Sequence, residues 1–357
     1  MAELIYYIKN IPDIESVTQY NHALGIAEYD SDSTLLTHQQ PPEPIQEQYE
    51  VIEVLNAETP IGRVANAVRF VNDAVERTSE TLLLTAGQIE PVVAGRLSRA
   101  HWVVDLYDDP LQGIKNDPLS RHQITDRIVK RLVANAPLGV NTLHVDAHNK
   151  AGIKKQYCIN GAPTTLIDHR IPERTKPLRA VVAGKVTLKK GMNIVIDGLA
   201  ATDVDVVIEA YGEVNGETER YCRRAGVKDR VRFHGQTQHA EVMEAVSDAH
   251  AGLCVLPARE DWKYHYPIKL GEYLAGGTVP IASDFPAFRE LCGDSGIYVT
   301  PSADGVARGI EEFDSLSSKK YRNWSQAARR RGEEVRWKRV RTAFTSKCRS
   351  GWNTDEN

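Results

Sequence analysis

The sequence predicts an α/β protein with two Rossmann-like domains, each built on a parallel sheet that helices cover on both faces. Three observations lead to this prediction. The chain has 357 residues, which is long enough for two hydrophobic cores. Short apolar runs alternate with segments of helical periodicity in both halves, as in βαβ units. Residues 170–178, RIPERTKPL, combine two prolines with several charges and are typical of a linker.

These features predict three parts of the chain. The first domain covers residues 1–170, the second covers residues 171–318, and a basic region of helices and tail covers residues 319–357. A net charge of −4 and 41% hydrophobic residues indicate an ordinary soluble protein without a membrane span. The N-terminus lacks the apolar core of a secretory signal, and the five cysteines are scattered without CxxC spacing. We therefore expect reduced thiols and a cytoplasmic location.

In the first half, apolar runs predict strands and periodic segments predict helices. The predicted strands are residues 4–8, 49–55, 81–85, 102–110, 140–145 and 163–167. The predicted helices are residues 18–27, 61–77, 91–99, 121–134 and 147–153. Residues 37–50, THQQPPEPIQEQYE, are rich in proline and glutamine and predict a surface loop.

The run WVVDLYDDP, residues 102–110, is an apolar strand that continues into acidic residues. Ligands of open α/β sheets bind at the carboxyl ends of strands, so Asp105, Asp108 and Asp109 are expected where chemistry takes place. The alternative is a loop whose aspartates cap the following segment. His22 is expected to be structural or solvated rather than catalytic, and His144 is expected to be a packed histidine rather than a ligand.

In the second half, the predicted strands are residues 179–183, 203–210, 230–233, 251–256 and 279–282. The predicted helices are residues 217–225, residues 239–247 and a helix that begins at Pro267. The adjacent glycines Gly276 and Gly277 end this last helix. The alternation again predicts a parallel sheet.

Two lysines follow the first strand of this half in the segment GKVTLKKG, residues 184–191. A glycine at a strand end lets the backbone turn close to a ligand. Lys185 and Lys190 then direct two ammonium groups at one strand tip, which suits a diphosphate. The alternative is a pair of exposed lysines.

The helix that begins at Pro267 and Ile268 offers free amides and a positive dipole end to an anion. Lys269 in its first turn can reach a bound anion, and Glu272 lies one turn further on the same face. A phosphate would repel Glu272, so a sugar diol is its better partner. Phosphate and diol together describe a nucleotide. An ordinary crossover helix with a solvated Lys and Glu stays open as the alternative.

The run PIKLGEYLAGGTVPIASDFPAFREL, residues 267–291, resembles the signature of retaining glycosyltransferases of the GT-B fold, family 4, also called glycosyl transferases group 1. That signature has two glutamates eight positions apart. Glu272 matches the second, so the resemblance implies that it holds the donor ribose. Tyr264 stands at the first position, where the family's glutamate is tied to the donor sugar. The resemblance therefore places Tyr264 and His265 near that sugar and leaves its identity open.

Other segments extend the resemblance. GKVTLKKG is similar to the family's Gly-Arg-x4-Lys-Gly element, which implies that Lys185 and Lys190 neutralise the donor diphosphate. VRFHG is similar to the loop that lies against the base, which implies base contacts near His234 and Gly235. By a short alignment, Asp108 matches the active-site position that faces the transferred sugar. The family's glycine-rich loop after the first strand is absent, since KNIPDIESVTQYNHALG has no paired glycines.

The resemblance implies two domains that face each other across a cleft, with C-terminal helices returning to the first domain. It also implies transfer of a hexosyl unit from a nucleotide-sugar to an acceptor hydroxyl in glycan, polysaccharide or glycolipid synthesis. No cofactor and no metal are expected, because no DxD-like run stands where a metal-bound diphosphate needs one. The acceptor is open, with a lipid-linked acceptor and a growing glycan as candidates.

Two other functions stay open on the sequence. One is an epimerase-like enzyme that acts on a nucleotide-sugar without an acceptor. The other is a non-catalytic partner subunit that binds nucleotide, which the altered Tyr264 and the missing glycine loop favour.

Residues 319–349 contain twelve Lys or Arg and two acids, a net charge of +10. This region forms either a solvated face or a peripheral contact with an anionic surface such as the inner membrane face. Nucleic acid is not expected as a partner, because aromatics of the stacking kind do not interleave with these charges.

Overall fold

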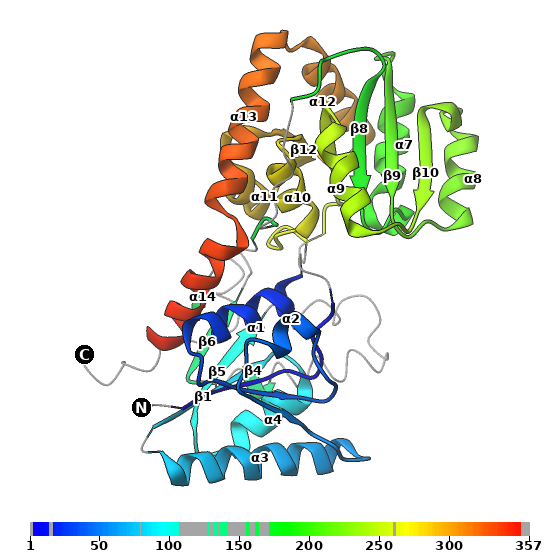
Figure 1. Cartoon of the computed structure of the whole chain (residues 1–357). Coiled ribbons are helices and arrows are strands. Elements are labelled where there is room, and N and C mark those ends of the chain that lie inside the picture. The colour runs from blue at the N-terminus through cyan, green and yellow to red at the C-terminus, as the bar shows by residue number, and fades with distance from the viewer. Residues whose placement is uncertain are drawn as a thin grey trace. The chain divides into compact units, whose positions relative to one another are not determined.

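The computed structural model describes residues 3–13, 17–78, 80–106, 128, 131–133, 136–141, 155–157, 161–163, 171–259 and 262–350. The chain forms two compact units, which Figure 1 shows. Unit 1 combines Met1–Asn160 with Trp337–Asn357, and unit 2 is Gly161–Arg336. Unit 1 is therefore discontinuous in sequence, and the boundary falls after residue 160 where the sequence predicted residue 170.

Unit 1 contains a seven-stranded sheet in the order β3-β2-β1-β4-β5-β6-β7, in which every neighbouring pair is parallel. The strands are β1 (Glu3–Tyr7), β2 (Thr34–Thr37), β3 (Val51–Val54), β4 (Thr81–Ala86), β5 (His101–Leu106), β6 (Leu138–Asn141) and β7 (Lys155–Tyr157). β1 lies near the middle of this sheet. Its apolar side chains are buried on both faces of the sheet, as is usual for parallel sheets covered by helices.

Helices cover both faces of this sheet. They are α1 (Thr18–Tyr29), α2 (Glu43–Gln46), α3 (Pro60–Arg77), α4 (Ile89–Leu97) and α14 (Trp337–Ser350). Figure 1 shows α1 and α2 on one side of the sheet and α3 and α4 on the other. Tyr6 and Ile8 face α1 and α14, whereas Ile5 and Tyr7 face α3, because successive strand residues alternate between faces.

A buried polar group sits beneath α1 and α14. Asp105 Oδ2 accepts hydrogen bonds from the Tyr6 hydroxyl at 2.8 Å and from His22 Nδ1 at 2.9 Å. The His22 ring also stacks on Phe344 of α14, with the ring centroids 3.6 Å apart. His22 is thus a packed histidine, as predicted. The placement of Asp105 among residues for chemistry is wrong, because its side chain is fully buried in the core of unit 1.

Unit 2 contains a six-stranded parallel sheet in the order β10-β9-β8-β11-β12-β13. The strands are β8 (Leu178–Ala183), β9 (Val206–Tyr211), β10 (Val231–Gly235), β11 (Ala251–Cys254), β12 (Val279–Ser283) and β13 (Ile297–Val299). The helices that flank it are α7 (Met192–Ala200), α8 (Gly216–Arg224), α9 (His239–Asp248), α10 (Ile268–Gly276), α11 (Pro286–Cys292), α12 (Ala303–Ser315) and α13 (Ser318–Glu334). Residues of α7 and α12 join the core on one face, while α9 and α10 pack on the other.

Two segments differ from their predicted character. Residues 37–50 were predicted as a surface loop, yet they include α2, and Ile45 and Tyr49 are buried beside α1. Arg174, in the predicted linker, donates hydrogen bonds to the carbonyl oxygens of Phe313 and Asp314 at the end of α12. The charges in this segment therefore attach it to unit 2.

The basic region 319–349 is divided between the two units, because α13 belongs to unit 2 and α14 to unit 1. Part of its charge is neutralised by ion pairs. The buried Arg341 pairs with Glu28 at 2.8 Å, and Arg349 pairs with Asp30 at 3.6 Å. Every helix among the described residues is too short or too polar to span a bilayer.

Candidate functional site

The most promising site of unit 2 lies at the carboxyl end of β8. The chain passes from β8 to β9 on one side and later returns to β11 on the other side. The carboxyl end of β8 is therefore a topological switch point, where the connections from neighbouring strands run in opposite directions. A crevice forms outside the strand ends at such a point, and ligands of α/β sheets bind there.

Three neighbouring strands end here in glycines with positive φ. The values are +94° at Gly184, +123° at Gly212 and +73° at Gly235. The Gly184 N–H donates to the Tyr211 carbonyl oxygen at 2.9 Å, and the Gly212 N–H donates to the Gly235 carbonyl oxygen at 2.7 Å. A Cβ on Gly212 would lie 1.9 Å from the Gly184 carbonyl oxygen. The strand ends can approach this closely only because Gly212 has no side chain.

β8 and β11 separate toward this edge. Their ladder pairs Val181 with Gly252 and goes no further. The hydroxyl of Tyr273 from α10 occupies the opening, where it accepts a hydrogen bond from the Ala183 N–H at 3.1 Å and lies 3.3 Å from the Leu253 carbonyl oxygen. Burial raises the pKa of Tyr273 well above its usual value, so the hydroxyl stays protonated.

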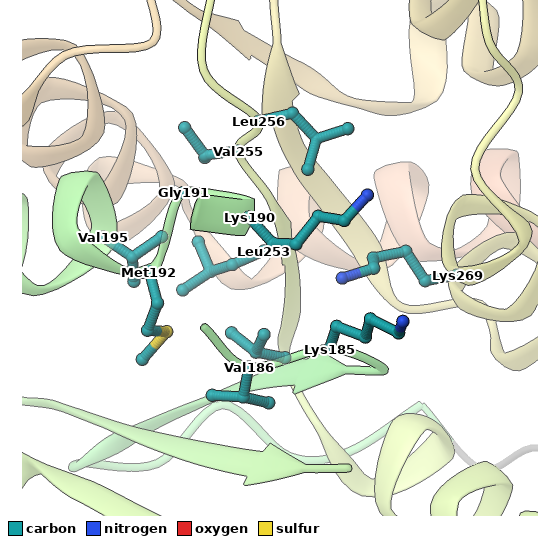
Figure 2. Close-up of a pocket in the computed structure, with 11 residues that line it drawn as sticks. Lys185, Val186, Lys190, Gly191, Met192, Val195, Leu253, Val255, Leu256 and Lys269 are labelled. Carbon is teal, nitrogen blue, oxygen red and sulfur yellow. The ribbon is translucent and has the colours of Figure 1, made fainter. Parts of the chain in front are cut away.

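A small pocket forms where these strands part. Its floor is apolar, and three lysines stand around it. The lining residues are Val182, Lys185, Val186, Lys190, Gly191, Met192, Val195, Leu253, Val255, Leu256 and Lys269. Figure 2 shows the three ammonium groups together on one side, away from Met192 and Val195. We refer to this site as the lysine pocket.

The three lysines come from different elements. Lys185 follows the Gly184 turn, Lys190 precedes α7, and Lys269 lies in the first turn of α10. Within the described part of the chain, no carboxylate pairs with Lys185 or Lys269. Grouped ammonium ions repel one another, so an anion in the pocket would stabilise all of them. The N–H of Leu270 donates to the Pro267 carbonyl oxygen at 3.0 Å, while the dipole of α10 and its first two N–H groups add to this positive field.

Trp262 packs against the lysine pocket through Lys190. The Lys190 ammonium lies 4.8 Å from the centroid of the Trp262 ring, and the Arg259 guanidinium carbon lies 4.4 Å from it. An indole face attracts cations, so Trp262 helps to hold both side chains in place. Sequence reasoning missed Trp262 and Tyr273. No local pattern distinguishes a tyrosine that only packs in the core from one, such as Tyr273, whose hydroxyl bonds at a strand end.

Glu272 does not line the lysine pocket. It lies one turn beyond Lys269 on α10, where its Oε1 accepts a hydrogen bond from Nε2 of His239 at 2.8 Å. Pro267 is the N-cap residue of α10 and Ile268 is its first residue, so the helix begins one residue after the predicted start. The structure thus brings Lys185, Lys190 and the start of α10 together, with Glu272 adjacent along the same helix.

The remaining predicted residues of unit 2 lie at the edges of this site. Tyr264 and His265 are partly exposed in the turn before α10. The His234 ring stacks on Tyr211 with the ring centroids 4.2 Å apart, and its Nε2 lies 2.7 Å from a carboxylate oxygen of Glu209. Both contacts hold the His234 side chain against β9. Gly235 forms the turn that receives the Gly212 N–H.

In unit 1 the strand ends carry an ion network in place of a glycine-rich loop. Glu90 pairs with Lys9 at 3.1 Å and with Arg63 at 2.9 Å, and the Lys9 backbone N–H donates to Gln88 at 3.0 Å. Burial opposes ionisation of Glu90, but hydrogen bonds from Arg63 and Lys9 hold its pKa below the usual value. The predicted Asp108 and the neighbouring Asp109 lie outside the described residues, as does His144.

Among the described residues, no three His, Cys, Asp or Glu side chains are grouped so that they could hold a metal ion.

Comparison with known protein families gives a match that lies within unit 2. Residues 164–331 match the family model described as Glycosyl transferases group 1. Comparison of the sequence with curated proteins gave no match.

Several solved structures resemble this chain over 98–99% of its length. HepE from Anabaena, in complex with UDP, is 16% identical with a TM-score of 0.73, over 98% of this chain and 100% of that one. Sucrose-phosphate synthase from Thermosynechococcus elongatus is 13% identical with a TM-score of 0.73, over 99% and 100%. A glycosyltransferase from Rickettsia africae is 12% identical with a TM-score of 0.72, over 98% of both chains. The fold is the two-domain GT-B fold of glycosyltransferases.

Proposed function

We propose that this protein is a retaining glycosyltransferase of family 4, which moves a sugar from a nucleotide-sugar to an acceptor hydroxyl. The observation that carries the proposal is the lysine pocket, where Lys185, Lys190 and Lys269 meet at the switch point beside the first turn of α10. The match of residues 164–331 to the group 1 family supports it. HepE, which shares the fold, has been solved with UDP.

The chemistry asked of this site is electrostatic. When the bond between the sugar and the diphosphate breaks, negative charge grows on the leaving oxygen. Preorganised positive groups stabilise that charge without having to rearrange during the reaction. Lys185, Lys190, Lys269 and the α10 amides provide such groups, so the proposed transfer needs no metal ion to hold the diphosphate.

We assign the other residues by the same proposal. Glu272 binds the ribose hydroxyls, and the turn at His234 and Gly235 lies beside the base. Tyr264 and His265 lie near the donor sugar. To Asp108 we assign the active-site role that the resemblance implies.

Ligand binding tests the proposal directly. A thermal-shift screen would compare ADP, GDP, UDP and their sugars with the corresponding monophosphates. We expect one diphosphate to raise the melting temperature by several degrees and its monophosphate to raise it much less, because the pocket provides more cations than one phosphate uses. If no diphosphate stabilises the protein better than its monophosphate, the lysine pocket is not a donor site.

Tyr264 supports a second candidate, a partner subunit that binds nucleotide but transfers nothing. It stands where the family has a carboxylate tied to the donor sugar. Incubation with the nucleotide-sugar that stabilises the protein most separates the candidates. Release of nucleoside diphosphate, alone or with acceptors, indicates transfer or hydrolysis, whereas tight binding with no release favours the partner subunit.

A further inference from the structure

The pair formed by Glu272 and His239 has a geometry that the family signature does not explain. Glu272 lies in the second turn of α10, and its side chain is 8% exposed. His239 is the first residue of α9, and its side chain is 41% exposed. The two helices pack against each other on the same face of the unit 2 sheet.

The hydrogen bond between them uses only one oxygen of the carboxylate. His239 Nε2 lies 2.8 Å from Glu272 Oε1, and the carboxylate can only accept, so the ring nitrogen donates. Among the residues that the structure describes, no other side chain or backbone group bonds to Glu272. Oε2 makes no hydrogen bond with a described residue and is not completely buried, so part of its surface stays open.

Packing already restricts the buried stem of Glu272, but without the histidine no hydrogen bond from a described residue would fix the direction of its carboxylate. A ligand would then have to order the carboxylate when it binds, and that ordering weakens affinity. With Oε1 held, Oε2 is already fixed in direction.

We propose that His239 is a positioning residue for Glu272, and that this pair recognises the ribose diol of the nucleotide. The inference rests on the proposed function, since it requires a nucleoside diphosphate in the lysine pocket. It adds a residue and a specificity to that function. Because the fixed carboxylate recognises hydroxyls, the site binds ribonucleotides in preference to their 2′-deoxy counterparts.

Titration calorimetry tests this with the tightest binder among ADP, GDP and UDP and with its 2′-deoxy counterpart. The variants are His239→Ala, His239→Gln and Lys190→Ala, and the matched control is Glu244→Gln on the exposed face of α9. We expect the wild type and the control to prefer the ribonucleotide about tenfold, as for one hydrogen bond to a charged group.

In His239→Ala the affinity for the ribonucleotide should fall about tenfold, and the preference over the deoxynucleotide should shrink toward one. His239→Gln should recover part of the preference, because a glutamine amide can donate to Oε1. Lys190→Ala should weaken both nucleotides equally and leave their ratio unchanged.

Three results would overturn the inference. An unchanged preference in His239→Ala would make the pair merely structural. Tighter binding in that variant would mean that the histidine competes with the ligand for Glu272. Equal affinity of the wild type for both nucleotides would show that the site does not recognise the ribose diol. A wild type that binds no nucleoside diphosphate is a separate outcome, which refutes the proposed function itself.

Discussion

At the scale of single residues, the proposed function depends on a few lysines, and their neighbours decide which of them line the pocket. Lys189 and Lys190 are adjacent and both exposed, yet only Lys190 lines the lysine pocket and contacts Trp262. A similar contrast separates the histidines, since His250 is fully buried whereas His101 is exposed. Residue type alone therefore says little about a residue's role. Because the two members of each pair have the same side chain, substituting both shows how much the effect depends on position in the structure.

We predict that Lys190→Ala abolishes sugar transfer and lowers nucleoside diphosphate affinity by about tenfold or more, because one charge-assisted contact is lost. Lys189→Ala is the control, and it should keep wild-type affinity. Calorimetry with the nucleotide that best stabilises the wild type measures both. Equal affinities in the two variants would show that Lys190 does not contact the ligand.

We also predict that unit 2 loses stability in acid through His250. Burial lowers the pKa of its ring, a hydrogen bond to the Glu173 carbonyl opposes this, and Arg179 and Arg174 add to the lowering. A folded-state pKa below the unfolded value means that the unfolded chain binds more protons. The stabilisation is therefore full above the unfolded pKa of about 6.5 and declines as pH falls below it.

The geometry supports the same sign. Nδ1 of His250 accepts a hydrogen bond from the Arg179 backbone N–H at 2.8 Å. In a protonated ring Nδ1 carries a hydrogen, so two N–H donors would face each other and this bond would be lost. Calorimetric melting temperatures of the wild type and His250→Gln, measured from pH 8 downward, should converge as pH falls. His101→Gln is the control and should follow the wild type. Parallel curves for His250→Gln and the wild type would contradict the prediction.

At the scale of elements, the site depends on how strands end. β8, β9 and β10 finish in glycine turns that bond to one another, and Tyr273 reaches from α10 to cover the gap between β8 and β11. None of these groups needs to touch a ligand. They determine where the Gly184 turn lies, and therefore where Lys185 points.

We predict that Gly212→Ala is more destabilising than Gly226→Ala. Both positions have positive φ, so both variants carry the backbone strain of about 1–2 kcal/mol. A Cβ at residue 226 meets nothing within 4 Å, whereas one at residue 212 would lie 1.9 Å from the Gly184 carbonyl oxygen. The difference in free energy of unfolding, measured in urea, should exceed about 1 kcal/mol. Nucleotide binding should suffer only in Gly212→Ala. Equal losses of stability would mean that the strand ends relax at little cost.

At the scale of the whole molecule, the two units differ in how the chain builds them. Unit 2 is one continuous segment, while unit 1 is completed by α14 from the far end of the sequence. Trp337 and Phe344 of α14 are fully buried in the core of unit 1, and Phe344 stacks on His22. Burial of one such side chain stabilises by about 1.5–3 kcal/mol, so unit 1 depends on its last helix.

We therefore predict that residues 161–336, expressed alone, fold cooperatively and bind the same nucleoside diphosphate as the full chain. Residues 1–160 alone should lack a cooperative thermal transition and should expose apolar surface, because the slots for Trp337 and Phe344 are empty. Calorimetry and binding of a hydrophobic dye check both fragments. A sharp transition in residues 1–160 would show that α14 is dispensable.

Much of the fold was predictable from local patterns. Apolar runs and helical periodicity indicated β1, α1, α3, β4 and most of unit 2 to within a few residues. They did not indicate β2 or β13, which are short, nor the burial of Ile45 and Tyr49 in a segment rich in proline and glutamine. Short elements carry too few residues for a period to stand out, and tertiary packing then decides their burial.

The sequence by itself determined the alternation of strands and helices, the glycine turn before Lys185, and the start of α10 directly after Pro267. These follow from backbone geometry and side-chain periods within a few residues of each other. Only the tertiary structure decided that Lys269 joins Lys185 and Lys190, that Glu272 pairs with His239, that Asp105 turns into the core, and that α14 completes unit 1. Such contacts join residues far apart in the chain, and they depend on the register and face of each strand and helix, which no local pattern records.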